Sequence, residues 1–192
     1  MTSPPRNVSV SVGLLAAADF AAHKHRAQRR KDASTTRYIN HPIRVALLLA
    51  QVAEINDLAT LQAALLHDTL EDTSTTPEEL ENLFGAEVRA LVQEVTDDKT
   101  LPSAKRKQLQ IEHAPSLSAK ARLIKLADKV ANVSDLTWEA PVTWPTQRKL
   151  AYLDWAEKVV GALQGCNQAL EQMFARLVAE KRKQFSSPPS EG

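Results

Sequence analysis

Apolar residues recur every three or four positions along almost the whole chain, and this periodicity constrains the fold more than any other feature. The segment KARLIKLADKVANVSDL shows the pattern clearly, because its aliphatic and alanine residues keep helical spacing. Only 5 of the 192 residues are glycine, which leaves few of the tight turns that a sheet-rich fold needs. The sequence therefore predicts an all-α fold, a single-domain helical bundle of about eight to ten helices.

Individual helices can be placed from apolar stripes and from signals at their ends. Thr76 and Pro77, followed by Glu79, form a capping-box pattern that predicts the start of a short helix. The domain is expected to cover residues 11–185, with disordered ends at residues 1–10 and 186–192, which carry proline and serine clusters. Longer helices are predicted at residues 12–29, 41–55, 58–70, 102–113 and 117–136.

Charge and cysteine content limit the class of partner and the compartment. The formal net charge is +1, so nothing favours binding to nucleic acid or to an anionic membrane. No uninterrupted apolar stretch reaches the roughly 18 residues of a membrane span, and Asp19 interrupts the run from Val8 to Ala22, which is interpreted as a helix rather than a signal peptide. Cys166 is the only cysteine, which favours a reducing compartment, and a cytoplasmic location is expected. These features predict no particular oligomeric state.

The stretch LLHDTLEDT, residues 65–73, places four ionisable side chains in an apolar helix. His67 and Glu71 are four residues apart, as are Asp68 and Asp72, so each pair shares one row of the predicted helix. Three carboxylates this close repel one another, and their pKa values would rise, unless a cation lies among them. The stretch therefore indicates a divalent metal site with its own acid–base pair.

Two residues from other helices extend this candidate site. Asp128 falls in line with Ile124 on a core-facing stripe, and an inward carboxylate needs a partner or a metal. His41 begins the most apolar helix, and with His67 and Asp68 it would complete a set of two imidazoles and two carboxylates. That set suits one Mn²⁺, Fe²⁺ or Zn²⁺ ion. Spacing alone leaves open the alternative of separate core polar groups, each with its own partner.

Four segments resemble the signature segments of the HD-type hydrolase domain of RelA/SpoT enzymes, and they occur in the same order. They are YINHPIRVA, LLHDTLEDT, FGAEVRALVQEVTDDK and IKLADKVANVSDL. The similarity runs from about Leu14 to about Leu177 and is greatest to the stand-alone small alarmone hydrolases, including those of the metazoan SpoT-homologue type. It implies an all-α HD-type domain that holds one Mn²⁺ through His41, His67, Asp68 and Asp128.

The resemblance also implies an activity, the hydrolysis of the 3′-pyrophosphate of guanosine tetra- or pentaphosphate, (p)ppGpp. The products would be GDP or GTP and pyrophosphate, so the partner would be a small nucleotide. By the same likeness Glu71 and Asp72 form the catalytic pair, with the roles of acid and base unassigned. The substrate-binding residues that it implies are Arg30, Lys31, Asn132, Arg148 and Tyr152.

Two other functions fit the same residues. One is removal of the 2′-phosphate of NADPH at the same site, and the other is a non-catalytic sensor that binds a nucleotide. Arg37 stands where the family commonly has proline, which leaves the conformation of the loop before His41 open. His23, His25 and His113 match no ligand position and are expected to be surface or partly buried histidines.

Overall fold

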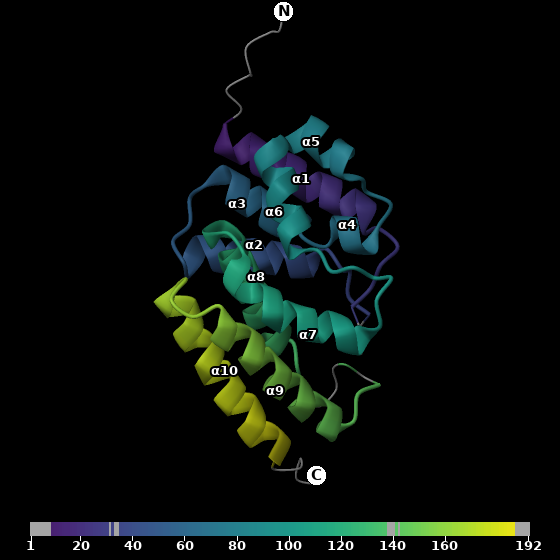
Figure 1. Cartoon of the computed structure of the whole chain (residues 1–192). Helices are drawn as coiled ribbons and strands as arrows, with labels where there is room; N and C mark the ends of the chain where they lie inside the picture. Colours follow the sequence, from purple (N-terminus) through teal and green to yellow (C-terminus); the bar gives the residue numbers. More distant parts are fainter. Residues whose placement is uncertain (1–8, 31, 33–34, 138–140, 142, 187–192) are drawn as a thin grey trace, which may run out of the picture.

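The computed structural model describes residues 9–186 except 31, 33–34, 138–140 and 142, and these residues form a helical bundle (Figure 1). Residues 1–8 and 187–192 of the predicted disordered ends lie outside the described residues. The described part contains ten α-helices and one 3-10 helix, so the predicted all-α fold is confirmed. None of these helices is long and apolar enough to cross a membrane. The elements are α1 (Val10–Lys24), α2 (Asn40–Gln51), α3 (Leu58–Leu66), α4 (Thr69–Asp72), α5 (Pro77–Phe84), α6 (Ala86–Val95), α7 (Ser103–His113), η1 (Ala114–Ser116), α8 (Ala119–Ser134), α9 (Thr146–Ala162) and α10 (Gln168–Ser186).

Two helices, α3 and α8, organise the bundle. α3 packs against α1, α2 and α6, whereas α8 packs against α2, α6, α9 and α10 (Figure 1). Every residue of α3 from Thr60 to Leu66 is buried, and α8 buries ten of its 16 residues. A helix that is apolar on most of its faces belongs in the interior of a protein. The polar groups that these two helices carry are therefore placed in or beside the core.

Side-chain caps fix where several helices begin. Asp57 Oδ2 accepts hydrogen bonds from the backbone N–H of Thr60, at 2.9 Å, and from its hydroxyl, at 2.6 Å, at the start of α3. The predicted cap is found at α5, where Thr76 Oγ1 accepts from the backbone N–H of Glu79. Ser118 caps α8 in the same way. Each cap satisfies an N–H group that the first turn of a helix leaves without an intrahelical partner.

Helix α1 lies close to α3 at Gly13. A Cβ atom on Gly13 would come within 3.0 Å of Leu58 Cδ2, and Gln62 Nε2 donates a 3.0 Å hydrogen bond to the Gly13 carbonyl. The helix predicted over residues 12–29 ends at Lys24, because the chain turns there and then pairs back on itself through an isolated bridge between Arg29 and Arg37. This close contact and the early turn bring residues 25–30 and 35–38 to the site described next.

Candidate metal centre and substrate groove

The helix that carries LLHDTLEDT is interrupted within the motif. The prediction of one helix over residues 58–70 is wrong, because α3 ends at Leu66 and α4 begins at Thr69. His67 Nδ1 donates to the Ala64 carbonyl at 2.8 Å, and Thr69 Oγ1 donates to the Leu66 carbonyl at 2.7 Å. These bonds satisfy carbonyls that the end of α3 leaves free. Adjacent residues of a regular helix point in different directions, so the break is what lets His67 and Asp68 face the same point.

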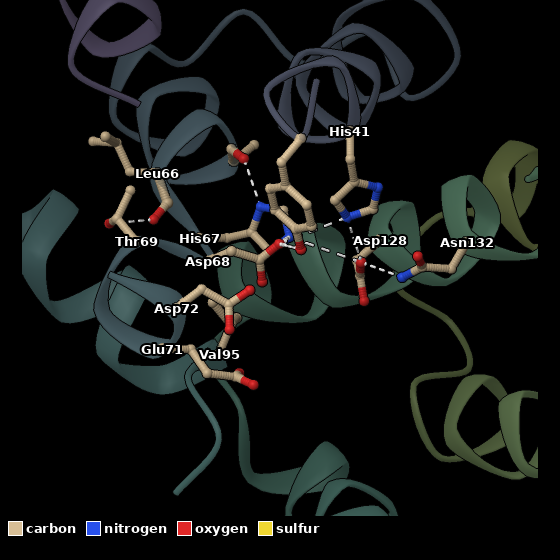
Figure 2. A network of polar contacts seen from close by, with 12 residues as sticks. His41, Leu66, His67, Asp68, Thr69, Glu71, Asp72, Val95, Asp128 and Asn132 are labelled. Atoms are coloured by element: carbon tan, nitrogen blue, oxygen red, sulfur yellow. Dashed lines mark hydrogen bonds and ion pairs between the residues drawn. The ribbon is translucent and has the colours of Figure 1, made fainter. Parts of the chain in front are cut away.

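Four side chains from α2, the α3–α4 junction and α8 converge there (Figure 2). His41 Nε2 lies 3.1 Å from Asp128 Oδ1 and 3.8 Å from Asp68 Oδ2. His67 Nε2 lies 3.0 Å from Asp68 Oδ2 and 3.8 Å from Asp128 Oδ1. The possible ligand atoms of His41, His67 and Asp128 all lie within 4.8 Å of one another, and the three residues are buried. The structure thus brings together the four residues predicted to hold a metal.

The hydrogen bonding of His67 fits a divalent ion. Because its Nδ1 donates to a carbonyl, the neutral ring carries its lone pair on Nε2. Nε2 is buried and has no hydrogen-bond partner, although it faces the cluster. A buried polar atom without a partner is costly, and a metal ion placed among these nitrogen and oxygen atoms would satisfy it. The residues present therefore fit a divalent metal site.

The charges around the cluster favour a cation. Burial opposes ionisation of His67, but the charges of Asp68 and Asp128 outweigh burial and raise the pKa of His67 to about 10. Burial also opposes the charges of the two carboxylates, yet His67 and Lys129 respectively hold the pKa values of Asp68 and Asp128 below their usual range. A proton and a metal ion compete for the same imidazole lone pair, so the carboxylates that favour the proton also favour the ion.

Neighbouring groups orient the carboxylates of the cluster. Tyr38 donates its hydroxyl proton to Asp68 Oδ2 at 2.6 Å. Lys129 Nζ donates to Asp128 Oδ2 at 2.9 Å, and Asn132 Nδ2 donates to Asp128 Oδ1 at 2.6 Å. Such partners restrict the rotamers of potential ligands, which is how a metal centre keeps its geometry.

Glu71 lines a cavity of about 140 Å³ together with all four cluster residues, and this space is called the inner cavity below. Its Oε2 accepts a 3.2 Å hydrogen bond from the backbone N–H of Asp97, and Arg106 Nη1 lies 3.5 Å from its Oε1. Burial, followed by the charge of Asp97, raises the pKa of Glu71 above its ordinary value. A carboxyl group with a raised pKa is suited to proton transfer closer to neutral pH.

Asp72 lines a different and larger space, a groove of about 850 Å³. Gln28 Nε2 donates to Asp72 Oδ2 at 2.8 Å, and Lys99 Nζ pairs with Asp72 Oδ1. Both oxygens of this carboxylate therefore have a donor. Tyr38, His41 and Asn132 line both the groove and the inner cavity, so the two spaces meet at the cluster.

The groove combines cationic and aromatic side chains. Arg29, Arg30, Arg44 and Lys99 line it, together with Trp144 and Tyr152. Cationic groups suit phosphates, and an apolar wall beside them suits the rest of a nucleotide. The groove is large enough for a small molecule of drug-like size, and it leads to the cluster.

Of the five predicted substrate-binding residues, three lie on this groove. Arg30 Nη2 donates to Asn132 Oδ1 at 3.3 Å, and Tyr152 faces Trp144 with 5.6 Å between ring centroids. Arg148 is exposed at the edge of this wall, with its guanidinium carbon 4.4 Å from the centre of the Trp144 ring. Lys31 lies outside the described residues.

Several groups that hold the site were missed by reasoning from the sequence. Tyr38 was detectable in part, since it stands three residues before His41 in YINHPIRVA. Gln28 carries no charge and follows no motif that the sequence analysis singled out. His25 was expected to be a surface or partly buried histidine, but it is buried with only 2% of its area exposed.

Comparison with known proteins shows which family this chain resembles. The family model described as HD domain matches residues 17–152. Two curated relatives carry the name guanosine-3′,5′-bis(diphosphate) 3′-pyrophosphohydrolase MESH1. The mouse (Mus musculus) protein is 56% identical and the human (Homo sapiens) protein 55% identical, and each alignment covers 90% of this chain and 97% of the relative. A solved structure of a metazoan orthologue of SpoT that hydrolyses ppGpp superposes with a TM-score of 0.86 at 44% identity, over 94% of this chain and 98% of the other.

Proposed function

This chain belongs to the HD-domain family and, within it, to the MESH1 group of guanosine-3′,5′-bis(diphosphate) 3′-pyrophosphohydrolases, and on that premise we propose that it hydrolyses (p)ppGpp. The products are GDP or GTP and pyrophosphate. One observation carries the proposal, the convergence of buried His41, His67 and Asp128 with the partly buried Asp68 where the inner cavity meets a cationic groove.

The metal in this proposal is one Mn²⁺ ion, held by the four cluster residues. Two imidazole nitrogens and two carboxylate groups without a thiolate suit Mn²⁺, and they would also accept Fe²⁺ or Zn²⁺. When bound, such an ion supplies positive charge for the phosphate oxygens and increases the acidity of water. The carboxylates of Asp68 and Asp128 are oriented by the hydrogen bonds that they accept from Tyr38, Lys129 and Asn132.

The proposed reaction breaks the bond between the ribose 3′-oxygen and phosphorus. The oxygen of water forms the new bond to that phosphorus, and pyrophosphate leaves with it. Glu71 lines the inner cavity, where it can accept the proton of the attacking water. Asp72 lines the groove proposed for the nucleoside, and we assign it the role of orienting the water or of helping to deliver a proton to the departing 3′-oxygen. The reaction is balanced, because one hydrogen of the water ends on the 3′-oxygen of the nucleotide and the remaining hydroxide becomes part of pyrophosphate.

Recognition of the nucleotide is proposed for the groove. Arg30 and Lys31 would contact phosphates, and Asn132 would contact the nucleotide next to the metal. Arg148 and Tyr152 would contact the ribose and the 5′-phosphates from the opposite wall. The proposed partner is thus this small nucleotide, without nucleic acid or membrane, and the proposed location is the cytoplasm, which agrees with the single cysteine Cys166.

The test is product analysis with metal-stripped protein and guanosine tetraphosphate, with and without added Mn²⁺, Fe²⁺ or Zn²⁺. Release of GDP and pyrophosphate that depends on Mn²⁺ is the expected result. NADPH is assayed in parallel, with release of inorganic phosphate as the readout. Phosphate release from NADPH without cleavage of guanosine tetraphosphate would reassign the substrate, and binding of the nucleotide without any product would identify a sensor.

A further inference from the structure

His25 and Gln28 are linked to the catalytic region although neither belongs to the predicted site. His25 Nδ1 lies 2.7 Å from Gln28 Oε1, and Gln28 Nε2 lies 2.8 Å from Asp72 Oδ2. The backbone N–H of Gln28 donates to the His25 carbonyl at 2.9 Å, so a single turn after α1 presents both side chains. The three residues form a chain of hydrogen bonds that ends on a proposed catalytic carboxylate.

The chemistry of Asp72 fixes the direction of these hydrogen bonds. A carboxylate only accepts, so the group of Gln28 that faces Asp72 must be its NH₂ group. The carbonyl oxygen of Gln28 then faces His25, and Nδ1 of His25 must carry a proton. The other ring nitrogen, Nε2, is buried without a hydrogen-bond partner. The Nδ1 donor of the imidazole therefore holds the Gln28 amide oxygen, at 2.7 Å.

Without the bond from His25, the Gln28 amide would be held only through its bond to Asp72. The amide could then move away, and Asp72 Oδ2 would lose its donor. With His25 in place, the amide presents a donor to Asp72 Oδ2, while Lys99 binds the other oxygen. The carboxylate is thereby held at the boundary between the groove and the metal cluster.

We propose that His25 and Gln28 are positioning residues that hold the Asp72 carboxylate in its reactive orientation. This inference rests on the proposed function for its kinetic consequence. His25 lines neither the groove nor the inner cavity, and Gln28 lines the groove beside Asp72, so the proposed effect of a change in either passes through Asp72. The expected effect falls on turnover rather than on substrate binding, because a displacement of about 1 Å in a catalytic group can cost up to about a hundredfold in rate.

A matched pair of substitutions separates this role from simple packing. His25 also packs against the Tyr38 ring, with 4.9 Å between ring centroids, so removing the imidazole has a packing cost. The side-chain nitrogen of Asn occupies nearly the same place as Nδ1 of His, whereas that of Gln corresponds to Nε2. His25→Asn and His25→Gln both lose the ring, but only His25→Asn keeps the donor to Gln28.

The experiment measures kcat and KM for guanosine tetraphosphate with the Mn²⁺-loaded full-length variants. His25→Gln is expected to lower kcat by about tenfold to a hundredfold with KM changed less than about threefold, and His25→Asn is expected to restore most of kcat. His23→Gln is the control, since His23 is exposed at the end of the same helix. Equal losses in both His25 variants, or no loss in either, would overturn the proposal.

A second substitution tests whether the two residues act as one unit. Gln28→Leu removes both hydrogen bonds and should lower kcat about as much as His25→Gln. Combining it with His25→Gln should cause no further loss, because the bond to Asp72 is already absent. Losses that multiply in the double variant would contradict a shared action through Asp72.

Crystal structures of the two His25 variants decide the inference independently of the substrate. The 2.8 Å contact between Gln28 Nε2 and Asp72 Oδ2 should persist in His25→Asn and be lost in His25→Gln. If the unmodified protein leaves guanosine tetraphosphate intact, the proposed function fails, and this comparison still supports or overturns the positioning role. If the unmodified protein is active and the contact persists in His25→Gln, only the positioning role fails.

Discussion

His67 shows how one residue can join local structure to chemistry. Its Nδ1 satisfies the Ala64 carbonyl at the end of α3, and this bond directs Nε2 into the cluster. Replacing His67 or Asp128 by alanine should abolish binding of the divalent ion, because each removes a buried group that faces the other ligands. Metal content after dialysis, measured by mass spectrometry, checks this result. The exposed His113→Ala variant is the control, and a full equivalent of metal in either cluster variant would contradict the assignment.

Glu71 should be needed for turnover and not for metal binding. It lines the same cavity as the cluster but pairs with Asp97 and Arg106. The Glu71→Gln substitution keeps the size of the side chain and removes the proton acceptor. We expect metal content to remain and kcat to fall by about a hundredfold to ten-thousandfold. Loss of the metal in this variant would instead place Glu71 among the ligands.

The pH dependence of the rate should reflect the raised pKa of Glu71. Burial and the charge of Asp97 place this pKa above the ordinary value of 4.5. A group that accepts a proton must start without one, so kcat at saturating metal should fall as the pH is lowered through the raised pKa. The acidic limb of the profile should therefore lie at higher pH than for an ordinary glutamate. An unchanged limb in the residual activity of Glu71→Gln would assign it to another group.

At the scale of helices, the cap of α3 controls the stability of the segment that leads to His67. Asp57 accepts from Lys120 Nζ, at 2.8 Å, and from Thr60, and these bonds lower the pKa of Asp57 to about 2. Asp57→Ala should lower the free energy of unfolding at pH 7 by about 1 kcal/mol. Because the folded pKa lies below the unfolded one, this contribution is present above about pH 4 and disappears as the pH falls towards about 2.

Denaturant unfolding at several pH values measures this effect. Ser9→Ala is the matched control, because Ser9 caps α1 through a hydroxyl that does not titrate in this range. The difference between the unmodified protein and Asp57→Ala should shrink between about pH 4 and pH 2, whereas the difference for Ser9→Ala should stay constant. A pH-independent difference for Asp57→Ala would mean that its carboxylate contributes no charge-dependent stability.

Helix starts could be predicted better than helix ends, and the reason is local. The cap at Thr76 depends on residues within one turn, so the sequence contains all of its determinants. The end of α3 depends on side-chain bonds from His67 and Thr69 to carbonyls, and the sequence pattern does not distinguish these bonds from a continuing helix. The turn that ends α1 likewise depends on pairing between Arg29 and Arg37.

For the whole molecule, the predicted site consisted of residues that can be recognised from their own type and position in the sequence, without knowledge of their contacts. Histidine and aspartate in an apolar helix stand out, so His67, Asp68 and Asp128 could be named before their contacts were known. The bond from Gln28 to Asp72 joins residues 44 positions apart and leaves no such sign in either segment. Contacts between neutral and charged groups across the fold therefore had to come from the structure.

Metal binding should stabilise the entire domain, because its ligands come from three segments, and the first and last ligands, His41 and Asp128, are 87 positions apart. Metal that binds only the folded state at 100 times its Kd adds about 2.7 kcal/mol to the free energy of unfolding. For a domain of this size that corresponds to a rise in Tm of roughly 5–11 °C. Differential scanning calorimetry of metal-stripped protein, with and without Mn²⁺, measures the shift.

Two variants serve as controls for this stability test. His67→Ala should show no rise in Tm with Mn²⁺, because it lacks a buried ligand. Asp57→Ala should have a lower Tm than the unmodified protein but the same rise with Mn²⁺, because its cap lies at the opposite end of α3 from His67 and the two effects should add. An equal rise in His67→Ala would place the bound ion elsewhere. A missing rise in Asp57→Ala would show instead that the site assembles only when α3 is fully capped, which would make the helix itself part of the metal centre.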